Sequence, residues 1–318
     1  MSAAKYRHNL PQLSEARMLT DGGIETTLIF HEGLDLPLFA AFKLFETSEG
    51  RAALRRYYSR YARIARDQRA GFVLDSATWR ANRDWGAQLG YGPEALAEAN
   101  RQAVALLFEL RREHEAQEPF VISGNIGPRG DGYVADAVMT PSEAEIYHAA
   151  QIATFDAAGV DMVSAITMTH TGEAAGISRA CAARGIPLAL AFTVETDGRL
   201  PSGQPLGEAI EEVDSDPSGG PSYFMINCAH PDHFRSVLDQ GAGWPKRIRG
   251  LRANASRQSH AELDAADELD DGNPEELAQD YAELTRLLPN LRVFGGCCGT
   301  DHRHVRAIGD SCLHAHAH

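Results

Sequence analysis

The sequence predicts a (β/α)8 TIM barrel with extended loops at the carboxyl-terminal face of its strands, and residues 1–318 are expected to form it as a single domain. Short apolar runs rich in β-branched residues alternate with longer amphipathic runs along the chain, which is the pattern of a parallel sheet with crossover helices. The apolar runs number eight, and eight parallel strands are the number that closes such a barrel.

The predicted strands lie near Met18–Glu25, Gly71–Thr78, Phe120–Gly127, Met162–Thr167, Pro187–Glu195, Tyr223–Ala229, Arg247–Ala255 and Arg292–Cys298. A doubly wound sheet is the alternative arrangement. No Gly-x-Gly-x-x-Gly sequence follows the first predicted strand, so dinucleotide binding has no support.

Helical periodicity is clearest in five segments, namely Arg51–Arg69, Pro93–Gln117, Pro141–Ala158, Gly172–Arg184 and Pro274–Leu288. Pro141 and Pro274 suit the first turn of a helix, where a missing N–H costs nothing. Thr140 is placed to cap the third helix, with Glu143 at capping-box distance. Two long polar connections, Thr196–Gly220 and Gln258–Asn273, are expected at the active face of the barrel, where either could act as a lid.

Composition excludes several classes of protein. The formal net charge is -14, which disfavours nucleic acid as a partner because phosphate binding needs a basic surface. No run approaches the roughly 18 apolar residues of a membrane span, and the first residues lack the apolar core of a signal peptide. We therefore expect a cytoplasmic protein without a membrane partner; assembly into a homo-oligomer stays open.

Polar residues and cysteines stand at the carboxyl ends of the predicted strands. They are Asp21, Thr78, Asn125, Glu195, Cys228, Asn254 and Cys297. In a barrel these ends converge on one mouth, so residues far apart in the sequence are expected to be neighbours there.

The cysteines give the strongest local signal. The chain has five of them, and an odd number in a long cytoplasmic chain argues against a disulfide framework. Cys297 and Cys298 can share one metal ion only if the backbone turns between flanking glycines. With Cys228 they would give zinc three thiolates and leave one position open, as in catalytic sites. The alternative is that these cysteines are small buried apolar residues.

Six segments, in order, resemble the homocysteine S-methyltransferase family, which includes betaine- and S-methylmethionine-using enzymes. They are Met18–Gly23, Asp75–Asn82, Ser123–Pro128, Asp197–Gly203, Ile226–Cys228 and Gly295–Thr300. The resemblance implies one barrel, Zn2+ held by Cys228, Cys297 and Cys298, homocysteine as methyl acceptor, and contact of Asp21 with that amino acid.

Two departures from the family concern the substrates. Ile166 stands where the family usually has a glutamate that binds the amino group of homocysteine. Either Asp21, Glu173 or Glu195 takes over that contact, or the acceptor is a different thiol. The family asparagine is kept at Asn254, but an acidic insertion follows it, so the methyl donor is open.

The implied reaction transfers a methyl group from a sulfonium or quaternary ammonium donor, such as S-methylmethionine or a betaine, to the thiol of homocysteine, giving methionine. Coordination to zinc removes the thiol proton. Trp79, at a strand end among polar residues, is the best candidate for a cation–π contact with the donor, although ordinary core packing would also explain it. The alternatives are methylation of another small thiol, a zinc-dependent hydrolase, which three thiolate ligands disfavour, and a non-enzymatic zinc- or thiol-binding protein.

Overall fold

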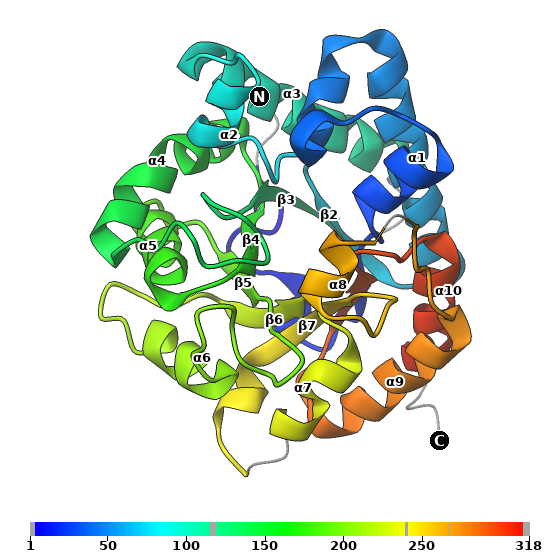
Figure 1. Cartoon of the computed structure of the whole chain (residues 1–318). Coiled ribbons are helices and arrows are strands. Elements are labelled where there is room, and N and C mark those ends of the chain that lie inside the picture. Colours follow the sequence, from blue (N-terminus) through cyan, green and yellow to red (C-terminus); the bar gives the residue numbers. More distant parts are fainter. Residues whose placement is uncertain (1–3, 115–118, 239–240, 267, 314–318) are drawn as a thin grey trace.

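Eight parallel strands form a closed barrel in a computed structural model that describes residues 4–114, 119–238, 241–266 and 268–313. Strands adjacent in the sequence are adjacent in the sheet, and Met18 of the first strand pairs with both Gly71 and Val293. Helices surround the strands on the outside (Figure 1). The predicted fold class is therefore confirmed.

All eight predicted strands are present, and most are shorter than expected. Their bounds are β1 Met18–Leu19, β2 Gly71–Asp75, β3 Phe120–Ile126, β4 Met162–Met168, β5 Leu188–Phe192, β6 Tyr223–Asn227, β7 Ile248–Ala253 and β8 Val293–Gly296. The difference lies mainly at the carboxyl ends, because there the backbone leaves the ladder and turns into the loops that carry the polar residues.

The helices are α1 Ser48–Asp67, α2 Arg83–Gln88, α3 Pro93–Glu113, α4 Pro141–Ala158, α5 Thr171–Ala182, α6 Leu206–Asp214, α7 Pro231–Leu238, α8 His260–Asp264, α9 Pro274–Leu287 and α10 His302–Cys312. Thr140 and Glu143 form the predicted capping box of α4. The predicted helix Pro93–Gln117 is observed to Glu113, and residues 115–118 lie outside the described part.

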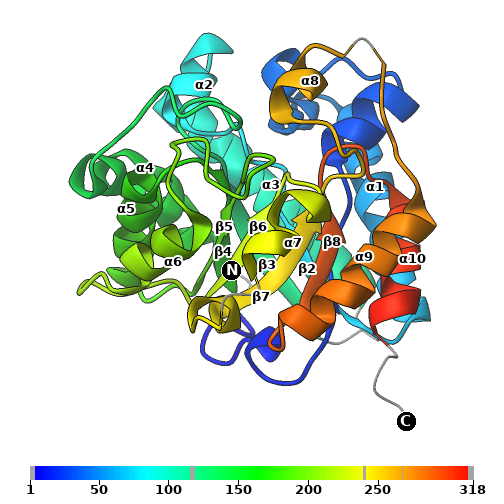
Figure 2. The same cartoon turned by 60° about the horizontal axis from the view of Figure 1, so that its bottom comes forward.

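The two long connections differ from each other. Thr196–Gly220 contains α6, whose buried face includes Leu206, Ile210 and Val213. Their helical spacing marks a crossover helix of the outer ring, so the expectation of a lid is wrong for that part. In the described part of Gln258–Asn273 the regular structure is the short helix α8, which lies beyond the barrel at the same end as α2 (Figure 2).

Apolar side chains pack in two layers, one between the barrel and its helices and one inside the barrel. The inner layer includes Val73, Met162, Ile166 and Met225, and Leu10 packs against it. The segment that carries Leu10 crosses the barrel at the end opposite α8 (Figure 2). Among the described residues, no helix has the length and apolar content needed to cross a lipid bilayer.

Candidate metal and substrate site

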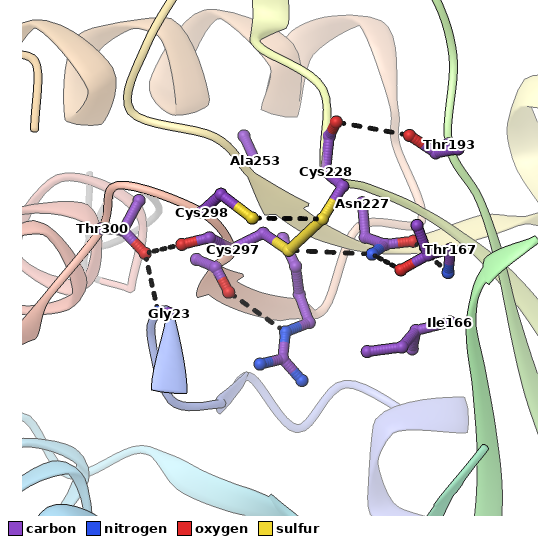
Figure 3. Close-up of a disulfide and its surroundings, with 12 residues drawn as sticks. Gly23, Ile166, Thr167, Thr193, Asn227, Cys228, Ala253, Cys297, Cys298 and Thr300 are labelled. Carbon is purple, nitrogen blue, oxygen red and sulfur yellow. Dashed lines mark hydrogen bonds between the residues drawn. A yellow bond between two sulfur atoms is a disulfide. The ribbon is translucent and has the colours of Figure 1, made fainter. Parts of the chain in front are cut away.

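Three cysteine sulfurs meet at the mouth of the barrel. Cys228 follows β6, while Cys297 and Cys298 follow β8, and their sulfur atoms all lie within 4.8 Å of one another (Figure 3). Cys228 has a φ of 53°, a left-handed conformation that turns the chain sharply after the strand. Cys228 is 69 residues from Cys297 in the sequence, and its side chain nevertheless meets the paired cysteines, as the barrel fold led us to expect.

The paired cysteines lie in a tight turn made possible by glycine. The backbone N–H of Thr300 donates to the Cys297 carbonyl at 3.1 Å, and Gly299 has a φ of 77°. A Cβ atom at Gly296 would collide with the Thr300 hydroxyl. The predicted turn between glycines is therefore present, and it allows both sulfurs to face the same site.

One of the sulfur pairs has the spacing of ligands around a tetrahedral metal ion. Cys228 Sγ and Cys298 Sγ are 3.8 Å apart, and bonds of about 2.3 Å in a tetrahedron place two sulfurs roughly 3.8 Å apart. Cys228 and Cys297 form a disulfide (Figure 3), which the argument against a disulfide framework did not anticipate. Thiols gathered at one point are also close enough to join on oxidation. The three side chains could hold a metal ion in their reduced form.

The thiol of Cys298 lies in an environment that disfavours its anion. Burial raises the pKa of this thiol to about 11, and the hydrogen bond with the Tyr133 hydroxyl acts in the opposite direction. The Tyr133 oxygen is 3.2 Å from Cys298 Sγ. A bound cation would favour the thiolate, because it offsets the cost of a charge removed from water.

His260 connects Glu195 to the first cysteine. Its Nε2 lies 2.7 Å from the Cys228 carbonyl oxygen, and its Nδ1 lies 3.1 Å from Glu195 Oε1. The His260 ring also stacks on Tyr133, with 4.1 Å between ring centroids. Glu195, predicted as a substrate contact, therefore belongs to a hydrogen-bonded chain that ends at Cys228.

Asn227 links the β4 end to the paired cysteines. Its side chain accepts from the Thr167 N–H at 2.8 Å and donates to the Thr167 hydroxyl at 2.9 Å. Asn227 Nδ2 also lies 3.8 Å from Cys297 Sγ (Figure 3). The two bonds hold Thr167, whose φ is 64°, in a conformation that a threonine rarely adopts.

Asp21 is held by a buried arginine that the sequence analysis did not single out. Arg252 donates to Asp21 Oδ1 at 2.6 Å and to Asp75 Oδ2 at 2.7 Å, and the Tyr57 hydroxyl donates to Asp21 Oδ2 at 2.9 Å. Burial raises the pKa of Asp21, and the Arg252 charge opposes that shift.

Thr78 and Trp79 lie at the end of β2. The Thr78 hydroxyl donates to the Asn125 carbonyl at 2.7 Å, and Trp79 Nε1 lies 3.4 Å from the Ile166 carbonyl oxygen. The guanidinium of Arg80 stacks over the Trp79 ring at 4.1 Å. A cationic methyl donor would therefore have to use the ring face that Arg80 leaves free.

Asn125 and Asn254 each have a side-chain oxygen without a hydrogen-bond partner among the described residues. Both side chains are buried, and the oxygen in question is Oδ1 in each. The backbone N–H of Asn254 donates to the Ala229 carbonyl, next to Cys228. Buried acceptors without a partner are costly in a folded protein and are often explained by function.

Ile166 lies in β4 with its side chain buried. The three carboxylates considered as replacements for the family glutamate are all engaged. Asp21 binds Arg252, Glu195 binds His260, and Glu173 accepts from the Arg129 N–H at 2.7 Å and lies 2.9 Å from His148 Nε2. An amino group that binds to one of these carboxylates would have to share it with the partner already bound there.

Glu25 is an ionisable group of the mouth that the sequence analysis missed. It lies beside a turn in which the Gly23 N–H donates to the Thr300 carbonyl at 3.0 Å, so this turn is joined to the turn of the paired cysteines. Burial raises the pKa of Glu25 to about 7. The side chain can therefore exchange a proton near neutral pH.

His230, Asp232 and Asp280 form a second group with the spacing of a metal site. Arg257 lies 2.9 Å from Asp232, and Arg235 pairs with Asp280. The arginine charges offset both carboxylates, so the group is explained as an ion-pair network.

Arg252 and His260 are the main site residues absent from the sequence prediction. A signal existed for each of them. Arg252 is a charged residue inside a predicted barrel strand, and Ser259 with Glu262 forms a capping box that marks the helix starting at His260.

Comparisons with known proteins find the same fold. The chain resembles two crystal structures of the homocysteine methyltransferase MmuM from Escherichia coli, the oxidized form (TM-score 0.76, 18% identity) and the metallated form (TM-score 0.74, 19% identity). Each alignment covers 96% of this chain and 99% of the other. At this identity the likeness shows the fold. No curated protein matches the chain.

The sequence model of the family described as Homocysteine S-methyltransferase matches residues 18–312. This range includes the eight strands and the three cysteines at the barrel mouth. The chain is therefore an enzyme of the homocysteine S-methyltransferase family.

Proposed function

We propose that this enzyme transfers a methyl group from a sulfonium or quaternary ammonium donor, such as S-methylmethionine or a betaine, to the thiol of homocysteine, and that Zn2+ held by Cys228, Cys297 and Cys298 serves the reaction. The single observation that carries the proposal is the convergence of three sulfurs, from the ends of β6 and β8, within 4.8 Å. Three protein ligands leave a fourth position for the acceptor sulfur.

Zinc, when bound, would keep the acceptor thiol deprotonated, so that its sulfur can attack the donor methyl carbon. The new sulfur–carbon bond forms as the bond between that carbon and the donor sulfur or nitrogen breaks, leaving a neutral sulfide or amine. The residues of the mouth hold the two substrates in line, with the reacting atoms about 3–3.5 Å apart.

The other site residues are proposed to contact the substrates. Asp21 keeps acceptor capacity beside its bonds to Arg252 and Tyr57, because a carboxylate has about four lone-pair sites. Asn125 and Asn254 supply buried acceptor oxygens. Thr78 orients the Asn125 backbone through its 2.7 Å hydrogen bond.

Trp79 and Glu195 are the groups suited to a cationic donor. Trp79 offers a ring face, and Glu195 offers a carboxylate whose side chain is 35% exposed.

The test uses zinc-loaded protein, a panel of sulfonium and betaine donors, and homocysteine deuterated in its carbon chain. The label separates methionine made from the acceptor from methionine left by an S-methylmethionine donor. We expect heavy methionine by mass spectrometry, its loss in Cys298→Ala, and its retention in Cys181→Ala, a buried free cysteine outside the site. The proposal would be overturned if Cys298→Ala formed as much heavy methionine as the wild type. It would also be overturned if the wild type formed no heavy methionine with any donor of the panel.

A different small thiol is the second candidate acceptor, favoured by the buried Ile166 and by the engagement of Asp21 and Glu195 with other partners. An apolar side chain cannot accept a hydrogen bond from an ammonium group. The same assay with thiols that lack an amino group, such as 3-mercaptopropionate, distinguishes the two. Faster turnover of such thiols than of homocysteine would assign the acceptor to that class.

A further inference from the structure

Two loops that are far apart in the sequence meet at the cysteines. The loop after β3 contributes Tyr133, and the polar insertion after β7 contributes His260, the first residue of α8. Their rings are nearly parallel, at 11°, with 4.1 Å between the centroids. Each residue also reaches a different cysteine, because Tyr133 contacts the Cys298 sulfur and His260 contacts the Cys228 carbonyl.

His260 is fixed from three sides. A carbonyl oxygen can only accept, so His260 Nε2 donates to Cys228 at 2.7 Å, while Nδ1 faces Glu195 Oε1 at 3.1 Å and Tyr133 covers a ring face. The capping box of Ser259 sets the start of the helix. His260 is 4% exposed, in an insertion whose other residues are mostly exposed.

The hydrogen bond from His260 to the Cys228 carbonyl stabilises an unusual backbone conformation at Cys228. A residue with a side chain rarely adopts a φ of 53°, because its Cβ then crowds a carbonyl oxygen, and the surroundings must hold it in that conformation. The Cys228 carbonyl accepts from His260, and Thr193 Oγ1 lies 3.3 Å away as a second donor. These bonds fix the direction of the Cys228 side chain.

The contact with Cys298 acts on the sulfur itself. The loop of Tyr133 is anchored, because Arg80 donates to the Gly130 carbonyl at 3.0 Å and the Tyr133 N–H donates to Asp131 at 2.7 Å. A thiolate has no proton to donate, so the Tyr133 hydroxyl is then the donor of the 3.2 Å contact. Such a bond orients the sulfur and withdraws charge from it.

We propose that His260 and Tyr133 are positioning residues of the metal centre, which orient Cys228 and Cys298, and that the insertion after β7 takes part in the active site through His260. This inference rests on the proposed function, since it requires that the cysteines bind zinc. It assigns a role to a segment whose composition is that of a solvated surface.

The experiment measures the metal and not only turnover. The variants are His260→Ala, His260→Gln, whose amide can still donate to the Cys228 carbonyl, Tyr133→Phe, which keeps the ring stack, and the control Glu268→Gln, an exposed position of the same insertion. Zinc affinity is measured by competition with a chromophoric chelator. The sulfur-to-metal charge-transfer band is recorded after substitution with Co2+.

We expect His260→Ala to weaken zinc binding roughly 10–100-fold, as loss of an outer-shell contact does, and His260→Gln to recover most of the affinity. Tyr133→Phe should move the cobalt band to longer wavelength, because loss of the hydrogen bond raises the energy of the sulfur lone pairs. Glu268→Gln should match the wild type in both measurements.

The outcomes separate the two proposals. Suppose that the wild type binds zinc and methylates a thiol, and that the His260 and Tyr133 variants equal it in zinc affinity and cobalt spectrum. That result would overturn the positioning role alone. Wild-type protein that binds no zinc at the cysteines would overturn the proposed function and this inference with it. Equal loss of affinity in His260→Ala and His260→Gln would overturn the positioning role of His260, because packing and not the hydrogen bond to Cys228 would then explain the loss.

Discussion

Arg252 lies 2.6 Å from Asp21 inside the barrel mouth, where both side chains are buried. Asp75 binds the same guanidinium at 2.7 Å. Arg252→Met would leave two buried carboxylates without their cation. Removing one partner of a buried ion pair costs about 3–5 kcal/mol, and we expect a loss of this size in the free energy of unfolding, measured by urea denaturation.

The control for this variant is Arg56→Met. Arg56 is exposed and pairs with Glu32 at 3.3 Å, so its replacement should change stability by about 0.5 kcal/mol or less. Equal effects of the two substitutions would show that the Arg252 cluster does not depend on its charge.

Cys228→Ala should lose stoichiometric zinc, because the two remaining thiolates make a weak site. Cys181→Ala is the matched control, since Cys181 is a free buried cysteine of α5. Zinc is counted by elemental analysis after dialysis against a weak chelator. A full equivalent of zinc in Cys228→Ala would exclude this residue as a ligand.

Gly296→Ala should destabilise the fold, because the added Cβ would meet the Thr300 hydroxyl and side chain. Overpacking typically costs about 1–3 kcal/mol, and displacement of the cysteine turn should also lower zinc affinity. Thermal unfolding and chelator competition measure the two effects.

Two further variants check this cause. Gly92→Ala has open space around the new Cβ and should be tolerated. The double variant Gly296→Ala/Thr300→Ala should cost less than the sum of the single changes, because the colliding hydroxyl is gone. Strict additivity would place the strain elsewhere.

His230 should make stability depend on pH. Burial lowers its pKa from the usual 6.5 to about 4, so between these values the unfolded chain binds the proton that the folded chain refuses. Stability therefore falls as the pH decreases through this window. The stability advantage of wild type over His230→Asn should shrink by up to about 3 kcal/mol between pH 7 and pH 4.

Other histidines titrate in both proteins, so the difference between the two unfolding free energies isolates His230. Urea denaturation at closely spaced pH values measures it. A difference that stays constant across the window, or grows as the pH decreases, would contradict the assignment.

The barrel could be predicted because its signals are local. The eight β-branched runs and the helical runs between them, such as the one with a cap at Thr140 and a proline in its first turn, are each recognised from residues that are close together in the sequence. The turn at Cys297 and Cys298 was predictable for the same reason, since its glycines are adjacent in the sequence. The convergence of Cys228 on that turn followed from barrel topology, because parallel strands end at one face.

The amino-acid sequence by itself determined the fold class, the family and the three cysteines. Tertiary structure alone decided which charges neutralise one another and which loop residues reach the mouth. Arg252 pairs with Asp21 from 231 residues away, and His260 meets Tyr133 only because two loops happen to leave neighbouring parts of the same rim. Such contacts depend on the direction of side chains across the barrel, and no spacing along the chain encodes that direction.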